Sequence, residues 1–364
     1  ENTQADNFLR SLFTLTVDSD EFDRQETLFR NAVKQRHDVS TEHLRCAAGR
    51  PAETFSNEPE SDFTEPDLRR QIETALAEVE LVQPPTVDTA AEIDRIVATA
   101  VGTVADQVAG GVDWAQRRGW LMAAAAEMRA GWVETMAIMS AETGKTMHQA
   151  DPEVAEGIDF CSYYGGVGAK QLERLAGDGY DVTARGVVAV VAPWNFPFAI
   201  PTGGVASALA AGNSVILKPA PEAVHVGARI AELFWNAGVP RDVLQLVVCD
   251  DGPVGTRLVT HPDLDTITLT GAYDTAAMFL DWRPDLRVLA ETSGKNSLVI
   301  TAAADLDEAI ADLVNSAFGH AGQKCSAASL AIVDTHIYND PAFVRQLKDA
   351  VESLSVGAGW SFST

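Results

Sequence analysis

The sequence predicts an α/β fold built on a doubly wound parallel sheet, and three observations support this prediction. Apolar runs of strand length alternate with helical patterns from residue 186 onward. The runs are apolar throughout, as is typical of strands that are buried on both faces of a parallel sheet. Polar residues follow four of the runs, at the carboxyl ends where such sheets bind ligands. We therefore expect helices on both faces of the sheet.

Residues 1–85 differ from the rest of the chain, and we expect an acidic linker with short helices there. The segments NEPESDFTEPD (57–67) and VQPP (82–85) combine acidic residues with proline. Such a composition offers little apolar surface to offset the entropy lost on ordering. This region is expected to carry no chemistry.

A helical pattern begins near Asp88, ahead of the first expected strand. Apolar residues recur at spacings of three and four, and Asp113, with Gln116 three residues later, is a suitable helix cap. Gly144 ends the pattern. We interpret the stripe as the ordinary inner face of an amphipathic helix rather than as a cofactor site. Its members are Leu121, Ala125, Met128, Trp132, Met136 and Met139.

The apolar runs and the helices between them follow in order. The first run, GVVAVVAP (186–193), precedes a helix of small residues that extends to Ala211. The second run, NSVILKP (213–219), precedes a helix from Glu222 to Ala237. Four further runs are expected to continue the same sheet: VLQLVV (243–248), DTITLTG (265–271), RVLAE (287–291) and NSLVI (296–300).

The composition argues against several classes of function. A formal net charge of -25 leaves no basic stripe for nucleic acid. The longest nearly uncharged run, residues 186–217, is interrupted by prolines, so no transmembrane segment is expected. Nothing resembles a secretory signal or a metal-binding cysteine pattern. We therefore expect no bound metal, and we expect the thiols to be free in a reducing, cytoplasmic setting. The cysteines are Cys46, Cys161, Cys249 and Cys325.

Cys325 is a candidate nucleophile. It lies in GHAGQKCSAASLAIV (319–333), beside Lys324 and among small residues. A thiol needs only a modest push from a base or a positive dipole to react, and Lys324 or the N–H groups of a following helix could supply the dipole. The alternative is an inert buried cysteine, because cysteine is among the most buried residue types.

Three strand-end residues offer chemistry that would suit such a nucleophile. Glu291 is placed to act as a general base toward the thiol or a water, and a solvated loop glutamate is the alternative. Asn195, between two prolines in PWNFP, could donate a hydrogen bond to an oxyanion or only form the turn. Lys218 could bind a phosphate or a ribose hydroxyl, or be a surface lysine. The chain has no G-x-G-x-x-G fingerprint, so a dinucleotide would bind without a standard pyrophosphate cradle.

Five motifs, in this order and spacing, resemble the aldehyde dehydrogenase superfamily. They are APWNFP (192–197), LKPA (217–220), LTG (269–271), AETSGKN (290–296) and GQKCSA (322–327), and the resemblance covers about residue 88 to the end. AGQKCSA and IDFCSYYG (158–165) look like the delta-1-pyrroline-5-carboxylate (L-glutamate gamma-semialdehyde) dehydrogenase branch. The opening ENTQADNFLRSLF is similar to the segment that joins proline dehydrogenase to this enzyme in bacterial bifunctional proline-utilisation proteins.

This resemblance implies a Rossmann-like fold and the oxidation of L-glutamate gamma-semialdehyde to L-glutamate in proline degradation, with NAD as cofactor and NADP as the alternative. Cys325 would form a thiohemiacetal and then a thioester. Asn195, with the Cys325 backbone N–H, would hold the oxyanion, and Glu291 would activate the hydrolytic water. The implied cofactor contacts are Pro193, Trp194, Lys218, Gly255, Thr270 and Gly271, and Ser326 would touch substrate.

The chain departs from the family pattern at three places. The usual Gly-Ser-Thr-Glu turn reads Gly-Ala-Tyr-Asp (271–274), which removes a hydroxyl expected at the cofactor pyrophosphate. In NAD-preferring members a glutamate often follows Lys-Pro-Ala directly. Here Pro221 comes first and Glu222 second, so the choice between NAD and NADP stays open. The family's later Glu-x-Phe-Gly-Pro motif, its loop for the substrate carboxylate and its oligomerisation strand do not follow Cys325, so we expect a C-terminally truncated chain.

These expectations divide the chain into three regions: the linker (1–85), a dinucleotide-binding domain (86–290) and a partial second α/β domain for catalysis (291–364). The expected partners are a small-molecule substrate, a fused or adjacent proline dehydrogenase domain and, in the full-length protein, further copies of the chain in a homo-oligomer.

Three other functions stay open on the sequence. The first is an aldehyde dehydrogenase of different aldehyde specificity. The second is a thiol amidase or hydrolase that uses Cys325, Glu291 and a lysine such as Lys295 or Lys324, without a nucleotide. The third is a folding or assembly module whose chemistry is dormant.

Overall fold

A computed structural model describes residues 20–35, 55–110 and 112–364. The chain divides into two units, Glu1–His43 and Leu44–Thr364. The described part of the first unit is helix α2 (Asp20–Lys34), in which Glu26 and Arg30 form an exposed ion pair at 2.6 Å. The opening segment that resembles a proline-utilisation linker, and residues 36–54 with Cys46, lie outside the described residues.

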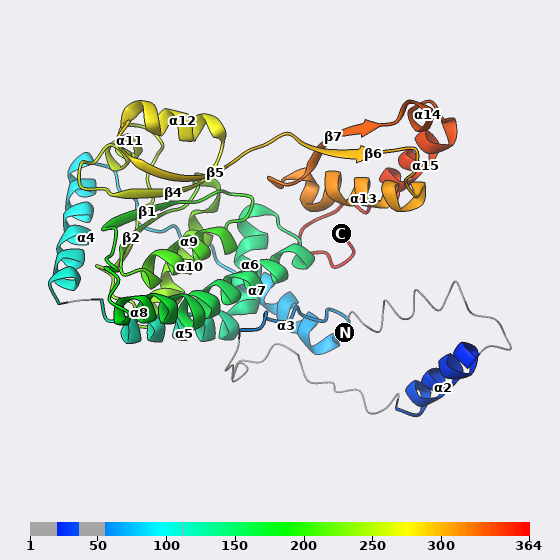
Figure 1. The fold of residues 1–364 in the computed structure, drawn as a ribbon, viewed down its shortest axis with the longest axis horizontal. Coiled ribbons are helices and arrows are strands. Elements are labelled where there is room, and N and C mark those ends of the chain that lie inside the picture. Colours follow the sequence, from blue (N-terminus) through cyan, green and yellow to red (C-terminus); the bar gives the residue numbers. More distant parts are fainter. Residues whose placement is uncertain (1–19, 36–54, 111) are drawn as a thin grey trace. The chain divides into compact units, whose positions relative to one another are not determined.

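A five-stranded sheet forms the centre of the second unit, with the strand order β3-β2-β1-β4-β5 (Figure 1). Every neighbouring pair in it is parallel, which confirms the predicted α/β fold. The chain runs outward from β1 to β3 and then returns to β4 on the other side of β1. Strand order therefore reverses between β1 and β4, which is where doubly wound sheets bind ligands. The strands are β1 (Val187–Val191), β2 (Ser214–Lys218), β3 (Leu244–Leu246), β4 (Thr266–Gly271) and β5 (Arg287–Thr292).

Helices cover both faces of this sheet because its strands are apolar on both sides (Figure 1). Val188 and Val190 of β1 belong to one core, whereas Val187 and Ala189, which point the other way, belong to a second. The first core includes α3 (Pro66–Glu78), α5 (Trp114–Ala130), α6 (Trp132–Thr143), α7 (Met147–Tyr163), α9 (Ala199–Ala210) and α10 (Val224–Asn236). The second core includes α4 (Ala90–Gly110), α11 (Pro253–Val259) and α12 (Tyr273–Trp282).

Short helical segments complete this unit between the larger elements. A π-helical turn, η1 (Tyr164–Gly168), continues α7 into α8 (Ala169–Gly177). A 3-10 turn, η2 (Pro221–Ala223), precedes α10. The expected strand at 243–248 is shorter than predicted, because only Leu244–Leu246 pairs along β2, and Val248 instead makes a single parallel bridge with Thr86.

The helical pattern that ends at Gly144 forms two helices rather than one. Asp113 caps α5 as predicted, because its side chain accepts a hydrogen bond from the Gln116 N–H at 2.9 Å. The chain then breaks at Gly131, where an added Cβ would collide with the guanidinium of Arg229. Gly144, with φ 72°, ends α6 in the left-handed conformation that favours glycine. The predicted stripe is buried core on both helices, including Trp132 at their junction.

The acidic, proline-containing segment at 57–67 is attached to the helical layer by polar contacts. Asp151 on α7 accepts hydrogen bonds from the Ser61 N–H at 2.7 Å and from its hydroxyl at 2.6 Å. Glu58 pairs with Arg129 of α5 at 2.9 Å. Phe63, together with Leu68 and Ile72 of α3, is buried in the first core. Partnered carboxylates and a few apolar anchors therefore order a segment whose composition alone offers little burial.

The prediction that residues 296–300 extend the main sheet was wrong. This strand, β6 (Asn296–Ile300), pairs with β7 (Ala328–Val333) in a separate two-stranded parallel sheet (Figure 1). Residues 293–295 separate it from β5, and its inner face packs on helices that follow it in the chain. These are α13 (Leu306–Phe318) and α15 (Pro341–Glu352), with the short turns η3 (Gly319–Gly322) and α14 (Thr335–Tyr338) between them. The mistake arose because an apolar run does not reveal which sheet it joins.

No helix within the described ranges is both long enough and apolar enough to cross a membrane.

Candidate active site

One cavity of about 570 Å³ opens at the carboxyl ends of the central strands. The turn after β1 contributes Pro193, Trp194 and Asn195, and Lys218 ends β2. Thr270 and Gly271 end β4, Glu291 lies near the end of β5, and Cys325 comes from the loop before β7. A volume of this size lies within the range typical of small-molecule sites.

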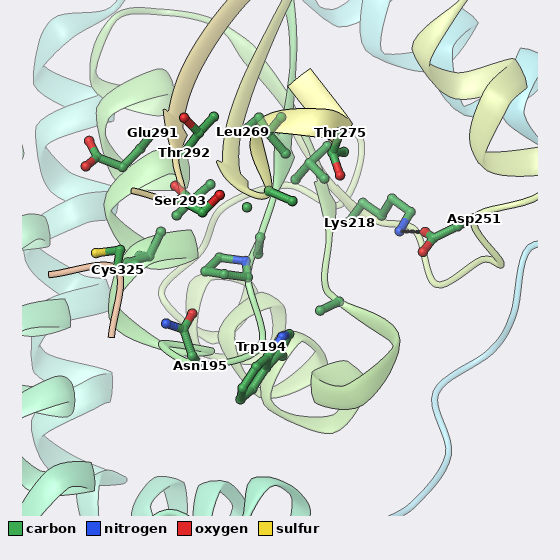
Figure 2. Close-up of a pocket in the computed structure, with 18 of the residues that line it drawn as sticks. Trp194, Asn195, Lys218, Asp251, Leu269, Thr275, Glu291, Thr292, Ser293 and Cys325 are labelled. Atoms are coloured by element: carbon green, nitrogen blue, oxygen red, sulfur yellow. Dashed lines mark hydrogen bonds and ion pairs between the residues drawn. The ribbon is translucent and has the colours of Figure 1, made fainter. Parts of the chain in front are cut away.

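The cavity has two chemically different ends. Figure 2 shows Cys325, Glu291 and Asn195 together toward the left of the view and Lys218 with Asp251 toward the right. Cys325 and Glu291 are exposed, so a solute can reach both side chains. The sequence predicted these three residues from three separate segments, and the fold brings them to one cavity.

The Cys325 loop is held by two side-chain amides. Asn195 Nδ2 donates to the Gln323 carbonyl at 2.7 Å, which ties the turn after β1 to the loop. Asn296, at the start of β6, donates to the carbonyls of Cys325 and Ala327. Because a side-chain amide has two N–H donors, Asn195 keeps one for a ligand in the cavity. The sequence analysis did not identify Asn296 or Gln323 as positioning groups.

At the other end, the Lys218 ammonium is almost buried and pairs with the exposed Asp251 carboxylate at 2.8 Å. Gly255, at the start of α11, lies against this pair, and a Cβ there would stand 2.8 Å from the Asp250 carbonyl. The lysine, the close backbone approach and the apolar walls suit a ribose, a phosphate and an aromatic base. The apolar walls are formed by Ile200, Val259, Leu269, Met278, Phe279 and Trp282.

The altered turn at 271–274 places Ala272, not a hydroxyl, on the cavity wall. Thr275, one turn into α12, lines the same wall and supplies a hydroxyl there (Figure 2). Glu222 also lines the cavity, near Lys218 in sequence but displaced by Pro221. Two carboxylates, Asp251 and Glu222, therefore border the end that contains the lysine.

Two predicted residues do not lie where the sequence analysis expected. Ser326, expected at the substrate, is exposed but is not among the residues that line the cavity. Lys295, which the amidase hypothesis would use, is also outside the lining, whereas Lys324 is part of it. Sequence proximity to Cys325 or Glu291 did not decide which side chains face the cavity.

A buried ion pair lies behind the turn that carries Asn195, and the sequence analysis missed it. Lys145, between α6 and α7, pairs with Glu153 of α7, and both side chains are at most 2% exposed. Burial lowers the pKa of Lys145, although the Glu153 carboxylate opposes the effect. Burial, reinforced by Lys145, lowers the pKa of the neighbouring His320 to about 4, so the imidazole is neutral at pH 7. No local sequence signal marks these residues as partners.

Known proteins resemble this chain in sequence and in fold. The family model described as the aldehyde dehydrogenase family matches residues 71–364. A 1-pyrroline-5-carboxylate dehydrogenase of Bacillus cytotoxicus is 36% identical over 257 residues, which cover 65% of this chain and 48% of the relative. A 1-pyrroline-5-carboxylate dehydrogenase of Bacillus thuringiensis is 38% identical over 60% of this chain and 45% of its own length. The chain thus spans about half the length of the curated relatives that it matches.

Solved structures give the same picture. Proline Utilization A (PutA) from Corynebacterium freiburgense matches with a TM-score of 0.77 and 39% identity, over 94% of this chain and 34% of the other. A 1-pyrroline-5-carboxylate dehydrogenase from Thermus, described with bound NAD, matches with a TM-score of 0.77 and 30% identity, over 85% of this chain and 69% of the other. The family match covers more than half of the sequence and includes every motif that lines the cavity, and the chain belongs to the aldehyde dehydrogenase family.

Proposed function

We propose that the protein to which this chain belongs oxidises L-glutamate gamma-semialdehyde to L-glutamate with NAD, as a step of proline degradation. The observation that supports this most strongly is the single cavity that joins Cys325, Glu291 and Asn195 to a second end lined by Lys218. A thiol hydrolase would use only the first end. The names of the similar proteins support the choice of substrate.

In this proposal the Cys325 sulfur attacks the aldehyde carbon and forms a thiohemiacetal. The free N–H of the Asn195 amide, with the Cys325 backbone N–H, stabilises the negative oxygen that develops, and loss of one such donor typically costs about 100- to 1000-fold in rate. Bound NAD would supply the hydride acceptor that converts this adduct into a thioester on Cys325. Glu291 then takes a proton from water, the water oxygen attacks the thioester carbon, and the Cys325 thiolate leaves as the acid is released.

The adenosine and pyrophosphate of the cofactor would occupy the end of the cavity opposite Cys325, and its nicotinamide would extend toward the thiol. Lys218 can donate to a ribose hydroxyl or a phosphate, and Gly255 permits close backbone approach. Thr270, Gly271 and Thr275 would face the pyrophosphate, and Pro193 and Trp194 would flank the path toward the thiol. These lining residues fit a dinucleotide.

For the substrate, Lys324 lines the cavity beside Cys325 and would attract the carboxylate that distinguishes this semialdehyde from simple aldehydes.

Further proposals concern the setting of the enzyme. We infer a dinucleotide-binding domain at 86–290, a catalytic domain that begins at 291, and residues 1–85 as a linker to a fused or adjacent proline dehydrogenase domain. A homo-oligomer in the cytoplasm completes the proposal, and the unpaired Cys161, Cys249 and Cys325 are consistent with a reducing compartment.

The test is turnover by the intact protein with L-glutamate gamma-semialdehyde and NAD, followed through reduced nicotinamide. The Cys325→Ala variant is expected to abolish turnover and retain NAD binding, measured by tryptophan fluorescence because Trp194 lines the cavity. Cys161→Ala is the matched control and keeps its activity, because that thiol is buried in the first core. Absence of reduced nicotinamide with this and with simple aldehydes would overturn the proposal, and oxidation of simple aldehydes alone would establish a different specificity.

A further inference from the structure

Lys145 lies almost fully buried with all of its hydrogen-bonding capacity engaged. An ammonium has three N–H donors and no acceptor. Lys145 contacts the Glu153 carboxylate, the Asn195 carbonyl oxygen at 3.0 Å and His320 Nε2 at 3.0 Å. Each proton therefore has one acceptor when the neutral imidazole carries its hydrogen on Nδ1. The ammonium also lies 4.5 Å from the centre of the Phe196 ring, which stacks on His320.

These acceptors belong to the two segments that must meet for catalysis. Asn195 lies on the turn after β1, whereas His320 begins the loop that leads to Cys325. His320 Nε2 and the Asn195 carbonyl oxygen lie 2.9 Å apart, because these two acceptors share the Lys145 ammonium. Lys145 thus joins the two backbones from behind, and the Asn195 side chain joins them from the cavity side through Gln323.

Glu153 fixes the far end of the same turn. Its carboxylate accepts hydrogen bonds from the N–H groups of Phe198 at 2.7 Å and Ala199 at 3.2 Å, where α9 begins. The turn from Asn195 to Ala199 is therefore held at one end by Lys145 and at the other by Glu153, which is paired with Lys145.

The His320 loop is strained where it contacts Lys145. His320 and Ala321 have φ values of 58° and 54°, in the left-handed region that is unfavourable for a residue with a side chain. The hydrogen bond to Lys145 and the stacking on Phe196 offset this cost, because both depend on the ring position that the strained backbone provides.

We propose that Lys145 is a positioning residue for the oxyanion donor: held by Glu153, it fixes the Asn195 turn against the loop of Cys325, so that the Asn195 amide faces the reacting carbonyl. This inference rests on the proposed function, because it assigns Asn195 the role of oxyanion donor. Buried ion pairs often add little net stability, and a function in orienting the site explains why this one is placed here.

A double-mutant cycle tests the proposal in the intact protein. Asn195→Ala is expected to lower kcat about 100- to 1000-fold, and Lys145→Met about 100-fold through misplacement of the amide, with NAD affinity unchanged. The double variant Lys145→Met/Asn195→Ala is expected to be within about 3-fold of Asn195→Ala alone, because Lys145 acts through Asn195. Effects that multiply would overturn the proposal, since they would mean that Lys145 affects the rate by another route.

Arg229→Met is the control, because Arg229 is also a buried cation, paired with Glu134 and Glu232 away from the cavity. Its effect is expected to multiply with that of Asn195→Ala. If Lys145→Met does not fold, Lys145→Met/Glu153→Gln removes both charges and keeps an acceptor for the Phe198 N–H. The same cycle with Asn195→Ala then decides the question.

Hydrogen exchange separates failure of this inference from failure of the proposed function. Backbone amides at 194–196 and 322–325 are expected to exchange at least 10-fold faster in the Lys145 variant than in wild type or Arg229→Met, whatever reaction the protein catalyses. If the wild-type protein oxidises no aldehyde but the exchange result is as expected, the proposed function is contradicted. Lys145 then remains the link between the two segments. Unchanged exchange at both segments would overturn the inference itself.

Discussion

At the scale of single residues, the cavity contains two kinds of group, and they differ in how visible they are in the sequence. Asn195, Lys218 and Glu291 follow apolar strands, so the rule for strand ends was enough to predict that they would meet. Lys145 and His320 lie in a helix connection and a strained loop, and nothing local marks either as part of a site. The packing of α7 against α9 brings Lys145 to the Asn195 turn, whereas His320 reaches it from the turn that follows α13.

His320 gives a pH prediction at this scale. Burial and then Lys145 hold its pKa at about 4, below the value of about 6.5 expected in the unfolded chain. The unfolded chain therefore binds a proton between pH 6.5 and 4 that the folded chain does not. The contribution of neutral His320 to stability is fully present above pH 6.5 and falls as the pH is lowered through this window.

The measurement compares melting temperatures of the wild type and His320→Phe at several pH values from 7.5 to 4.5. Phenylalanine keeps the stacking on Phe196 and cannot be protonated, so the wild type should lose more stability than the variant as the pH falls. Parallel curves for the two proteins would show that His320 is not held neutral.

At the scale of elements, local signals predicted where the helices begin and end better than which elements pack together. The Asp113 cap and the left-handed Gly144 were both predicted from residue type and spacing, and both are present. The break at Gly131 was not predicted, and the close approach of Arg229 from α10 to this glycine is a tertiary contact that no local pattern reveals. The assignment of β6 to the main sheet failed for the same reason: sheet membership is a tertiary property.

The Asp113 cap gives a prediction for this scale. Asp113→Ala removes the acceptor of the Gln116 N–H and is expected to lower the free energy of unfolding by about 1 kcal/mol. Asp312→Ala, on the exposed side of α13, is the control and should change stability by less than about 0.5 kcal/mol. Urea denaturation measures both, and equal effects of the two substitutions would mean that the Asp113 cap contributes nothing specific.

At the scale of the whole molecule, the central claim is that the reversal of strand order creates one cavity with a thiol at one end and a cation at the other. Residues from all five motifs line the cavity: four motifs end a strand or begin the segment after it, and GQKCSA lies in the loop before β7. The motifs did not predict that Ser326 would lie outside the cavity or that Asp251 would pair with Lys218. Both outcomes depend on loop conformation, which follows no simple periodicity.

The most direct test of this claim is a crystal structure of the intact protein with NAD. We expect the cofactor to lie between Lys218 and Cys325, with its adenosine against Val259, Phe279 and Trp282 and its nicotinamide ring beside the Cys325 sulfur. A structure in which NAD binds outside this cavity, or in which the sulfur points away from it into the protein interior, would contradict the account.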